Sequence, residues 1–207
     1  MPSMKRLDLE ILEKLYETRM VHDFPKNELR PYRSFQQLTK ENHYVSYGYI
    51  DDAGEILAYA CFAVLPKEKA VLLDYYAVDK RQRGTGIGSA FIRQFREAMA
   101  PVADHMLLEV ESVNTAKDDA DAEMRRHRIR FYEKNHSHLT GVRSRLMGVE
   151  FNVMCTPFTE RRMSDARIQE ELQKFYRFIL APILKAGETS DQYIDIWISG
   201  GEQLGDQ

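Results

Sequence analysis

The stretch from residue 70 to residue 111 limits the fold of this chain more than any other part of its sequence. An apolar run over 70–78 predicts a β-strand, and the glycine-rich segment 81–88 (RQRGTGIG) follows it directly. Apolar residues then recur at helical spacing until Pro101, and a second apolar run over 105–111 predicts another strand. A strand, a loop, a helix and a strand in this order predict two parallel strands joined by a right-handed crossover, and therefore an α/β fold.

The sequence on either side predicts further elements around this unit. Helical periodicity marks four segments, the last of which should kink or end near Pro182: 7–20, 32–40, 124–135 and 165–184. Runs of β-type residues predict a hairpin and three later strands: 44–50 with 55–65, segments within 140–147 and 149–156, and a tail strand at 192–199. The polar segment 113–123 is expected to be a solvated loop, and no strand is expected ahead of the first helix.

Composition restricts the class of protein. The 207 residues are 43% hydrophobic and 29% charged, which is ordinary for a globular protein with one core. A net charge of -3 gives no basic excess for a nucleic-acid partner, and no apolar stretch approaches the ~20 residues that span a bilayer. We therefore expect a cytoplasmic protein with no nucleic-acid or membrane partner. Cys61 and Cys155 lie in apolar strand-like runs and are expected to be buried free thiols.

The glycine-rich segment has the properties of a pyrophosphate-binding loop. Gly84, Gly86 and Gly88 allow positive φ and let backbone amides approach a ligand without a Cβ in the way. The helix that follows presents unpaired N–H groups and a partial positive charge at its N-terminus, which favours an anion. Arg81 and Arg83 add positive charge, although each is equally well explained as a solvated loop arginine.

Glycine loops occur in several classes of nucleotide-binding protein. A P-loop is excluded because no Gly-Lys-Ser or Gly-Lys-Thr step is present. A dinucleotide-binding fingerprint would place the third glycine one position later, but Glu109 and Glu111 follow at about the right interval for its acidic residue, so that alternative stays open.

The loop resembles the acyl-CoA signature of the GNAT superfamily of N-acyltransferases, Arg/Gln-x-x-Gly-x-Gly/Ala, which Arg81, Gly84 and Gly86 satisfy. A second segment, 130–134 (RFYEK), resembles the later "FYEK" helix of that family. The resemblance implies a mixed, mostly antiparallel sheet flanked by helices, with two central parallel strands that splay apart. Those strands would be 70–78 and 105–111, and the pantetheine arm of the cofactor would lie between them.

The resemblance also implies a function and a set of site residues. It implies an N-acetyltransferase that moves an acetyl group from acetyl-CoA to a primary amine by direct transfer in a ternary complex, with Tyr132 near the thioester sulfur. A non-catalytic acyl-CoA-binding sensor is the alternative. The implied cofactor-binding residues are Ala77, Val78, Arg81, Arg83, Gly84, Thr85, Gly86, Ile87, Gly88, Ser89 and Asn114.

The chemistry of acetyl transfer requires a base for the amine and an acid for the departing thiolate. Asp74, Glu109 and Glu111 are the candidate bases, and strand alternation places Glu109 and Glu111 on one face. Ion pairing of these carboxylates with arginines of the segment 125–130 is the competing explanation. Tyr132 suits the acid, because a phenol with a pKa near 10 stays protonated at neutral pH.

The remaining expectations concern metals, the acceptor and the organisation of the chain. His136 and His138 lack a third ligand at metal-site spacing, so no metal is expected. Residues 1–160 are predicted to form the acyltransferase domain, with 161–207 as a helical extension packed on it. The apolar face of the helix over 165–184 would pack on this domain or on a second subunit, which makes a homodimer one of two options. The acceptor would be a small-molecule or lysine-like amine; carboxylates at 109, 111, 118, 119 and 121 would favour a cationic one, or form a solvated face.

Overall fold

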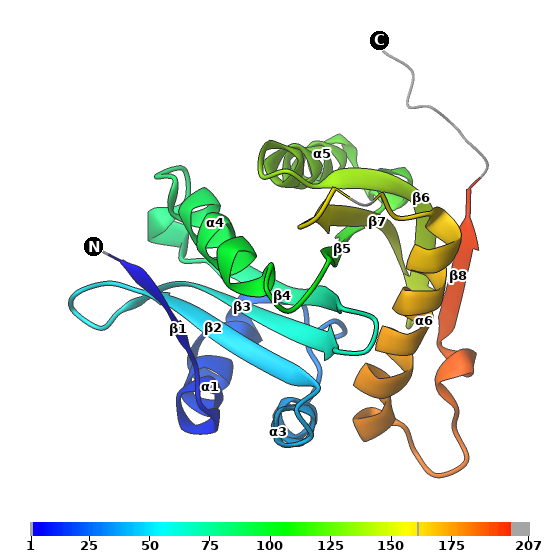
Figure 1. The fold of residues 1–207 in the computed structure, drawn as a ribbon, viewed down its shortest axis with the longest axis horizontal. Helices are drawn as coiled ribbons and strands as arrows, with labels where there is room; N and C mark the ends of the chain where they lie inside the picture. The colour runs from blue at the N-terminus through cyan, green and yellow to red at the C-terminus, as the bar shows by residue number, and fades with distance from the viewer. Residues whose placement is uncertain (1, 161, 200–207) are drawn as a thin grey trace.

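The computed structural model describes residues 2–160 and 162–199, which build an eight-stranded sheet with helices on both faces (Figure 1). The strands lie in the order β1-β2-β3-β4-β5-β7-β6-β8; β4 and β5 are parallel and the other neighbours are antiparallel. This confirms the predicted α/β fold, and it excludes a dinucleotide-binding fold, whose sheet is mostly parallel. The strands are β1 (Ser3–Arg6), β2 (Tyr44–Ile50), β3 (Ile56–Leu65), β4 (Ala70–Val78), β5 (His105–Glu111), β6 (His138–Leu146), β7 (Val149–Pro157) and β8 (Ile194–Ile198).

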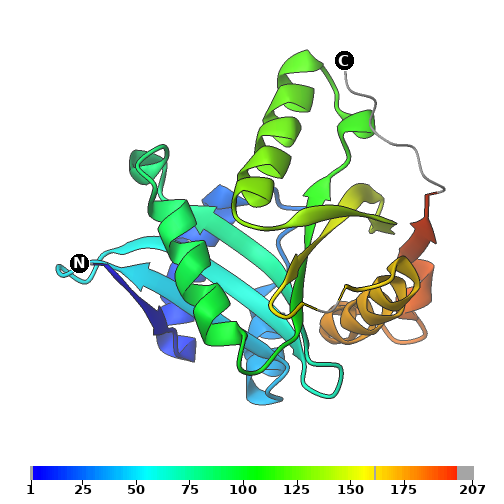
Figure 2. The same cartoon turned by 45° about the horizontal axis from the view of Figure 1, so that its top comes forward.

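Two groups of helices cover the two faces of the sheet (Figures 1 and 2). On one face, α4 and α5 bury Phe91 and Ile129 against the strands. On the opposite face, α1, α3 and α6 bury Leu12, Phe35 and Phe175 in a second cluster. The helices are α1 (Leu9–Leu15), α2 (Val21–Asp23), α3 (Tyr32–Lys40), α4 (Ile87–Met99), α5 (Asp119–Lys134) and α6 (Asp165–Leu180), and short 3₁₀ turns lie at Lys80–Gln82, Val113–Thr115, Ala181–Ile183 and Ser190–Gln192.

The parallel strands β4 and β5 are paired over only part of their length. Their register runs from Ala70 opposite His105 to Leu73 opposite Leu108 and goes no further. Asp74 is the extra residue of a β-bulge, because Cys61 of β3 pairs with Tyr75 whereas Phe62 pairs with Leu73. A bulge bends its strand and increases the local twist, which turns the end of β4 away from β5.

Beyond this point each central strand keeps its other neighbour. β4 stays paired with β3 as far as Val78, and β5 stays paired with β7 as far as Glu111. The segments 74–78 and 109–111, which we call the splay, therefore face each other without a hydrogen-bonded ladder. The predicted splaying of the two central strands is confirmed, and it begins at Asp74 and Glu109.

Two of the predictions about secondary structure are wrong: one strand was not expected, and one helix begins earlier than predicted. The chain has a first strand, β1, which pairs with β2 at the edge of the sheet. Its four residues, Ser-Met-Lys-Arg, are mostly exposed and too short to show alternation. The predicted loop over 113–123 ends early, because α5 begins at Asp119, where the Asp118 side chain accepts a hydrogen bond from the amide of Asp121. The acidic residues cap a helix here, as aspartates at a helix start do.

The other predictions agree with the structure to within a few residues. The first helix is interrupted by a π-helical turn at Tyr16–Met20, and α6 ends at Leu180, just before Pro182. The predicted tail strand is β8, and the rest of the tail, 200–207, lies outside the described residues. Cys61 and Cys155 are buried and free, as expected. Among the helices that the structure describes, none has the length and apolarity to cross a membrane.

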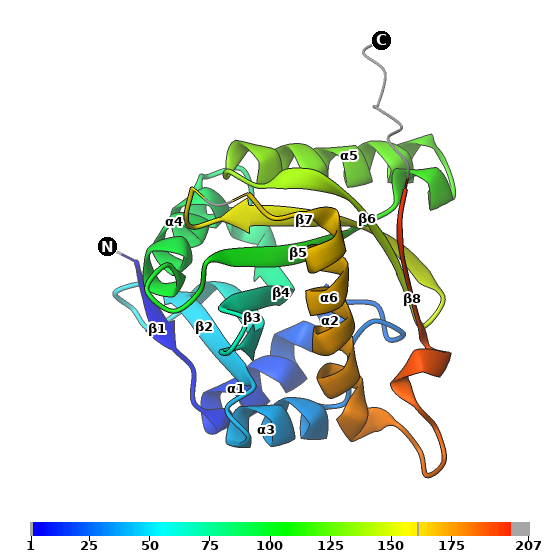
Figure 3. The same ribbon diagram turned by 45° about the vertical axis from the view of Figure 1, so that its right-hand side comes forward.

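Helix α6 packs on the strands of its own chain. It lies beside β8 (Figure 3), and it contributes Ile168, Leu172 and Ile179 to the same buried cluster as α1 and α3. Its apolar face is therefore covered within the subunit, which is one of the two arrangements that its sequence allows. The division of the chain at residue 160 stays a prediction.

Candidate active site

The glycine loop between β4 and α4 has the geometry of an anion cradle. Gly84 and Gly86 have φ values of +78° and +89°, in the left-handed region that favours glycine. Gly86 is the N-cap of α4, and its carbonyl accepts the first helical hydrogen bond, from the amide of Ala90, at 3.0 Å. The amides of Ile87, Gly88 and Ser89 come before that bond and belong to the first turn, whose N–H groups have no partner within a helix. These amides can hold a pyrophosphate.

Gly88 has a different role from the other two glycines. A Cβ at this position would lie 3.0 Å from the Tyr76 hydroxyl, 3.2 Å from Phe131 Cζ and 3.3 Å from Val78 Cγ2. The Tyr76 hydroxyl also donates a hydrogen bond to the Gly88 carbonyl at 2.9 Å. Gly88 therefore lets α4 approach β4 and α5 closely, which fixes the position of the loop against the sheet.

The two loop arginines lie at the surface beside the cradle. Arg81 folds back on Asp79, with Nη2 2.9 Å from Oδ2, and this contact holds the pKa of the Asp79 carboxyl well below its usual range. Nε of Arg83 donates to the Val78 carbonyl at 3.4 Å, and the Thr85 hydroxyl donates to the Gln82 carbonyl at 2.7 Å. Arg81 is 81% exposed, so it can leave Asp79 for a stronger anion at little cost.

Asp74 stands on the β4 side of the point where the splay begins, and a buried cation compensates its charge. Arg30 donates to both oxygens of this carboxylate, at 3.2 and 2.5 Å, and the Tyr44 hydroxyl also donates to Oδ2. Burial lowers the pKa of the Arg30 guanidinium, but the charge and hydrogen bond of Asp74, together with Tyr75 and Tyr44, outweigh burial and raise that pKa. Asp74 is thus held as an ion pair and is a poor candidate for the base.

Glu109 stands on the β5 side of the same point, and no described cation pairs with it. Its Oε1 accepts a hydrogen bond from Ser144 Oγ at 2.6 Å and another from the hydroxyl of Tyr176. Burial, opposed by these two donors and assisted by the charge of Asp74, raises the pKa of Glu109 to about 7. A carboxyl with this pKa can take up and release a proton near neutral pH, which is what a general base requires.

Glu111 lies two residues after Glu109 on β5. It has the arginine partners that the sequence predicts for both glutamates. Arg128 and Arg125 contact its two oxygens, the latter at 3.6 Å. Glu28, in the segment between α2 and α3, lies close enough that its pKa is raised by burial and by the charge of Glu111. Ion pairing with arginines therefore accounts for the polar position of Glu111, whereas Glu109 has hydroxyl partners instead.

Tyr132 lies on the opposite face of the sheet from Glu109. It projects from α5 and packs beside Tyr76 of β4, with ring centroids 6.3 Å apart. Burial raises the pKa of the Tyr132 hydroxyl, which keeps it protonated at neutral pH. Because Tyr76 also bonds to Gly88, Tyr132 lies on the same side of the sheet as the start of α4.

The splay thus has two chemically different sides. The side covered by α4 and α5 carries the glycine loop and Tyr132, and the side covered by α1, α3 and α6 carries Asp74 and Glu109. Glu111, at the end of β5, pairs with arginines of α5. The other predicted binding residues lie around the opening: buried Ala77 and partly buried Val78 on β4, and exposed Asn114 on the 3₁₀ turn after β5. A donor and an acceptor can approach the opening from opposite faces.

Sequence reasoning missed Arg30, Ser144, Tyr176 and Glu28. All four act on the predicted carboxylates from segments far along the chain, such as Tyr176, which is 67 residues from Glu109. The sequence gives only weak signals for them: Tyr176 falls on the apolar face of the helix predicted over 165–184, and Ser144 falls within the strand predicted in 140–147. His136 and His138 meet no further ligands: within residues 2–160 and 162–199 there is no group of three metal-ligating side chains.

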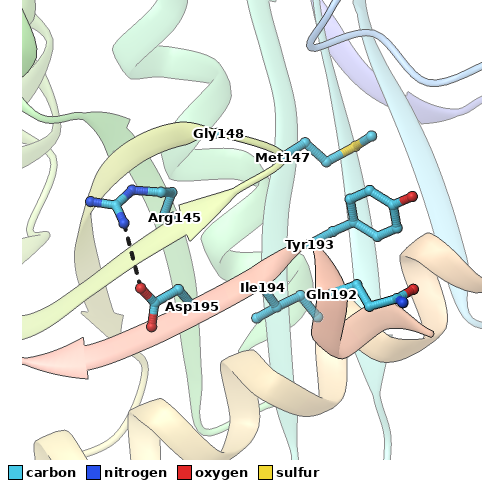
Figure 4. Close-up of a pocket in the computed structure, with 7 residues that line it drawn as sticks. All are labelled: Arg145, Met147, Gly148, Gln192, Tyr193, Ile194 and Asp195. Carbon is cyan, nitrogen blue, oxygen red and sulfur yellow. Dashed lines mark ion pairs between the residues drawn. The ribbon is translucent and has the colours of Figure 1, made fainter. Parts of the chain in front are cut away.

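A surface hollow of about 290 Å³ lies elsewhere, where the turn between β6 and β7 meets the start of β8 (Figure 4). Arg145 and Asp195 form an ion pair of 3.5 Å beside it, and Met147 and Tyr193 also line it. It contains none of the predicted site residues.

Comparisons with known proteins agree with this geometry. The sequence model of the Acetyltransferase (GNAT) family matches residues 9–136, more than half of the chain. The chain is 31% identical over 166 residues to the "Putative acetyltransferase YjbC" of Bacillus subtilis (strain 168), covering 75% of this chain and 76% of that protein.

Solved structures share the fold. A GNAT-family protein from Bacteroides thetaiotaomicron superposes with a TM-score of 0.66 at 16% identity, covering 88% of this chain and 99% of the other. An aminoglycoside 6'-N-acetyltransferase complexed with coenzyme A superposes with a TM-score of 0.56 at 13% identity, covering 78% and 99%. With its sequence match and its splayed sheet, this chain belongs to the GNAT family of acetyltransferases.

Proposed function

We propose that this protein is an N-acetyltransferase that moves an acetyl group from acetyl-CoA to a primary amine by direct transfer in a ternary complex. One arrangement carries the proposal: Glu109, whose pKa burial raises to about 7, and Tyr132, whose pKa burial also raises, lie on opposite faces of the sheet beside the splay. The first is suited to remove a proton from an amine, and the second is suited to give one to a thiolate.

The glycine loop is the site for the coenzyme. The first-turn amides of α4, with Arg81 and Arg83 beside them, would bind its pyrophosphate, and Ala77, Val78 and Asn114 would line its path along the splay. Acetyl-CoA supplies an activated acetyl thioester. The aminoglycoside 6'-N-acetyltransferase complexed with coenzyme A has the same fold, which supports this assignment.

Glu109 would remove the proton from the amine on the opposite side. A lysine-like ammonium has a pKa near 10.4, so deprotonation at pH 7 costs about 4.6 kcal/mol. A base with a pKa near 7, acting directly or through one water, takes that proton, and the neutral nitrogen then attacks the carbonyl carbon. When the carbon–sulfur bond breaks, the hydroxyl of Tyr132 protonates the thiolate sulfur.

The carboxylates Glu28, Glu109 and Glu111 line the acceptor side and favour a cationic amine, whether a small molecule or a lysine side chain. Arg125 and Arg128 offset part of that charge. We accordingly expect acceptors with one free primary amine and modest positive charge.

The test is release of free thiol from acetyl-CoA across a panel of primary amines, with product acetylation confirmed by mass spectrometry. Tyr132→Phe should lower kcat at least tenfold while the Kd for acetyl-CoA, measured by calorimetry, stays within twofold. Binding of acetyl-CoA without acetylation of any amine by the wild type would contradict the proposal and indicate a non-catalytic sensor.

A further inference from the structure

The segment after residue 160 reaches the candidate base, although it lies outside the part of the chain that matches the family model. We infer that Tyr176 of α6 is a positioning residue, an inference that rests on the proposed function. Together with Ser144 of β6, Tyr176 holds Oε1 of Glu109, so that Oε2 is the oxygen that takes the amine proton.

The contacts form a closed triangle of three polar side chains. Ser144 Oγ lies 2.6 Å from Glu109 Oε1, the Tyr176 hydroxyl also contacts Oε1, and the two hydroxyl oxygens are 2.9 Å apart. Ser144 and Tyr176 are fully buried, whereas Glu109 is only partly buried. Within the described residues no group hydrogen-bonds to Oε2 of Glu109. One oxygen is therefore fixed, and the other is left for a ligand.

Helix α6 is held rigidly enough to position a hydroxyl. Its face with Leu172, Phe175 and Ile179 is buried in the core. Glu171, five residues before Tyr176, contacts His105 Nε2 at 2.6 Å with both side chains buried. His105 and Glu109 are four residues apart on β5 and so share a face. Two polar contacts thus attach α6 to the strand that carries the base.

The two hydroxyl donors also affect the charge of Glu109. Hydrogen bonds to a carboxylate stabilise its ionised form and lower its pKa, against the effect of burial. Burial and the charge of Glu109 raise the pKa of the Tyr176 hydroxyl, so it remains a donor throughout the neutral range. Loss of this donor should raise the pKa of Glu109 and release its carboxylate from one orientation.

The test is a titration of the Glu109 carboxyl by NMR in protein labelled with ¹³C at glutamate side chains, with the Glu109 signal assigned by its loss in Glu109→Gln. Tyr176→Phe keeps the ring, and it should raise the pKa of Glu109 by about one unit, since one such unit is 1.36 kcal/mol, close to the value of a hydrogen bond to a charged group. Ser144→Ala should shift it in the same direction. Tyr193→Phe, in the same C-terminal segment but away from Glu109, is the matched control and should cause no shift.

A kinetic measurement separates this inference from the proposed function. With any amine that the wild type acetylates, Tyr176→Phe should lower kcat/KM about tenfold at pH 7 and move the rising limb of the pH profile upward, with unchanged Kd for acetyl-CoA. An unchanged Glu109 titration in both Tyr176→Phe and Ser144→Ala would overturn the inference, even if the enzyme is active. Absence of acetylation by the wild type would instead count against the proposed function, and the NMR titration would still decide the role of Tyr176.

Discussion

At the scale of residues, Asp74 and Glu109 show how the same side-chain chemistry acquires two roles. They are the first residues on each strand beyond the paired part of β4 and β5. Arg30 pairs with Asp74, whereas the described hydrogen-bond partners of Glu109 are hydroxyls. Burial, with a smaller contribution from the charge of Asp74, raises the pKa of Glu109 to about 7. An ion-paired carboxylate beside a carboxyl whose pKa is raised by burial is an arrangement found in acid–base sites.

The raised pKa of Glu109 predicts a pH-dependent change in stability for Glu109→Gln. Because the folded-state pKa exceeds the unfolded value, the stabilisation from this group is complete below about pH 4.5 and is lost as pH rises through about 7. The variant lacks this loss. The difference in free energy of unfolding between the variant and the wild type should therefore shift by roughly 2–3 kcal/mol in favour of the variant from pH 4.5 to pH 8. Urea denaturation at both pH values measures it. Glu111→Gln, which removes an arginine-paired carboxylate, should show no such gain.

The loop glycines predict a second contrast. Gly88→Ala places a Cβ 3.0 to 3.3 Å from three side-chain atoms, so it should destabilise the protein by about 1–3 kcal/mol and weaken acetyl-CoA binding by displacing α4. Gly84→Ala meets no atom within 4 Å and costs only the strain of positive φ, about 1 kcal/mol. Thermal unfolding and calorimetry with acetyl-CoA test both. A Gly88→Ala variant that loses less stability than Gly84→Ala and binds acetyl-CoA as tightly as the wild type would contradict the packing role of Gly88.

Sequence reasoning pointed to the proposed base and acid but not to the residues that contact them. Alternation along β5 pointed to Glu109, and the RFYEK segment pointed to Tyr132. The partners of Glu109 come from β6 and α6, and they meet it only because β7 and β6 follow β5 in the sheet order. A single sequence carries no record of such distant contacts.

At the scale of elements, a bulge at one residue opens the sheet. Strand periodicity predicted β4 and β5 with nearly correct ends, because both are long apolar runs. β1 was missed because it is a short, charged edge strand, and the start of α5 was missed because its aspartates suit a loop as well as a helix cap.

The attachment of α6 to β5 gives a prediction at this scale. Glu171→Gln should destabilise the protein by about 1–3 kcal/mol, because it weakens a fully buried contact with His105. Arg167→Ala, which removes the other partner of Glu171, should cost under about 1 kcal/mol, because that arginine is 32% exposed. Urea denaturation compares the two variants, and a larger loss from Arg167→Ala would show that the contact with His105 does not hold the helix.

At the scale of the whole molecule, the apolar cluster shared by α1, α3 and α6 predicts that the chain folds as one cooperative unit. A chain cut after residue 160 would lose α6 and expose the side chains it covers. We expect this fragment to lack a cooperative thermal transition, whereas the full chain shows a single transition with equal calorimetric and van't Hoff enthalpies. A fragment that unfolds cooperatively would identify 161–207 as a dispensable extension.

The most direct test of the account is the pH dependence of kcat/KM for acetyl transfer to the best amine of the panel, in the wild type and in Glu109→Gln. The account predicts that the wild-type profile rises with an apparent pKa of about 7, as Glu109 becomes ionised. It also predicts that Glu109→Gln loses this rise and at least a hundredfold in kcat/KM at pH 8, while binding acetyl-CoA normally. A Glu109→Gln enzyme with the wild-type profile and rate would contradict it.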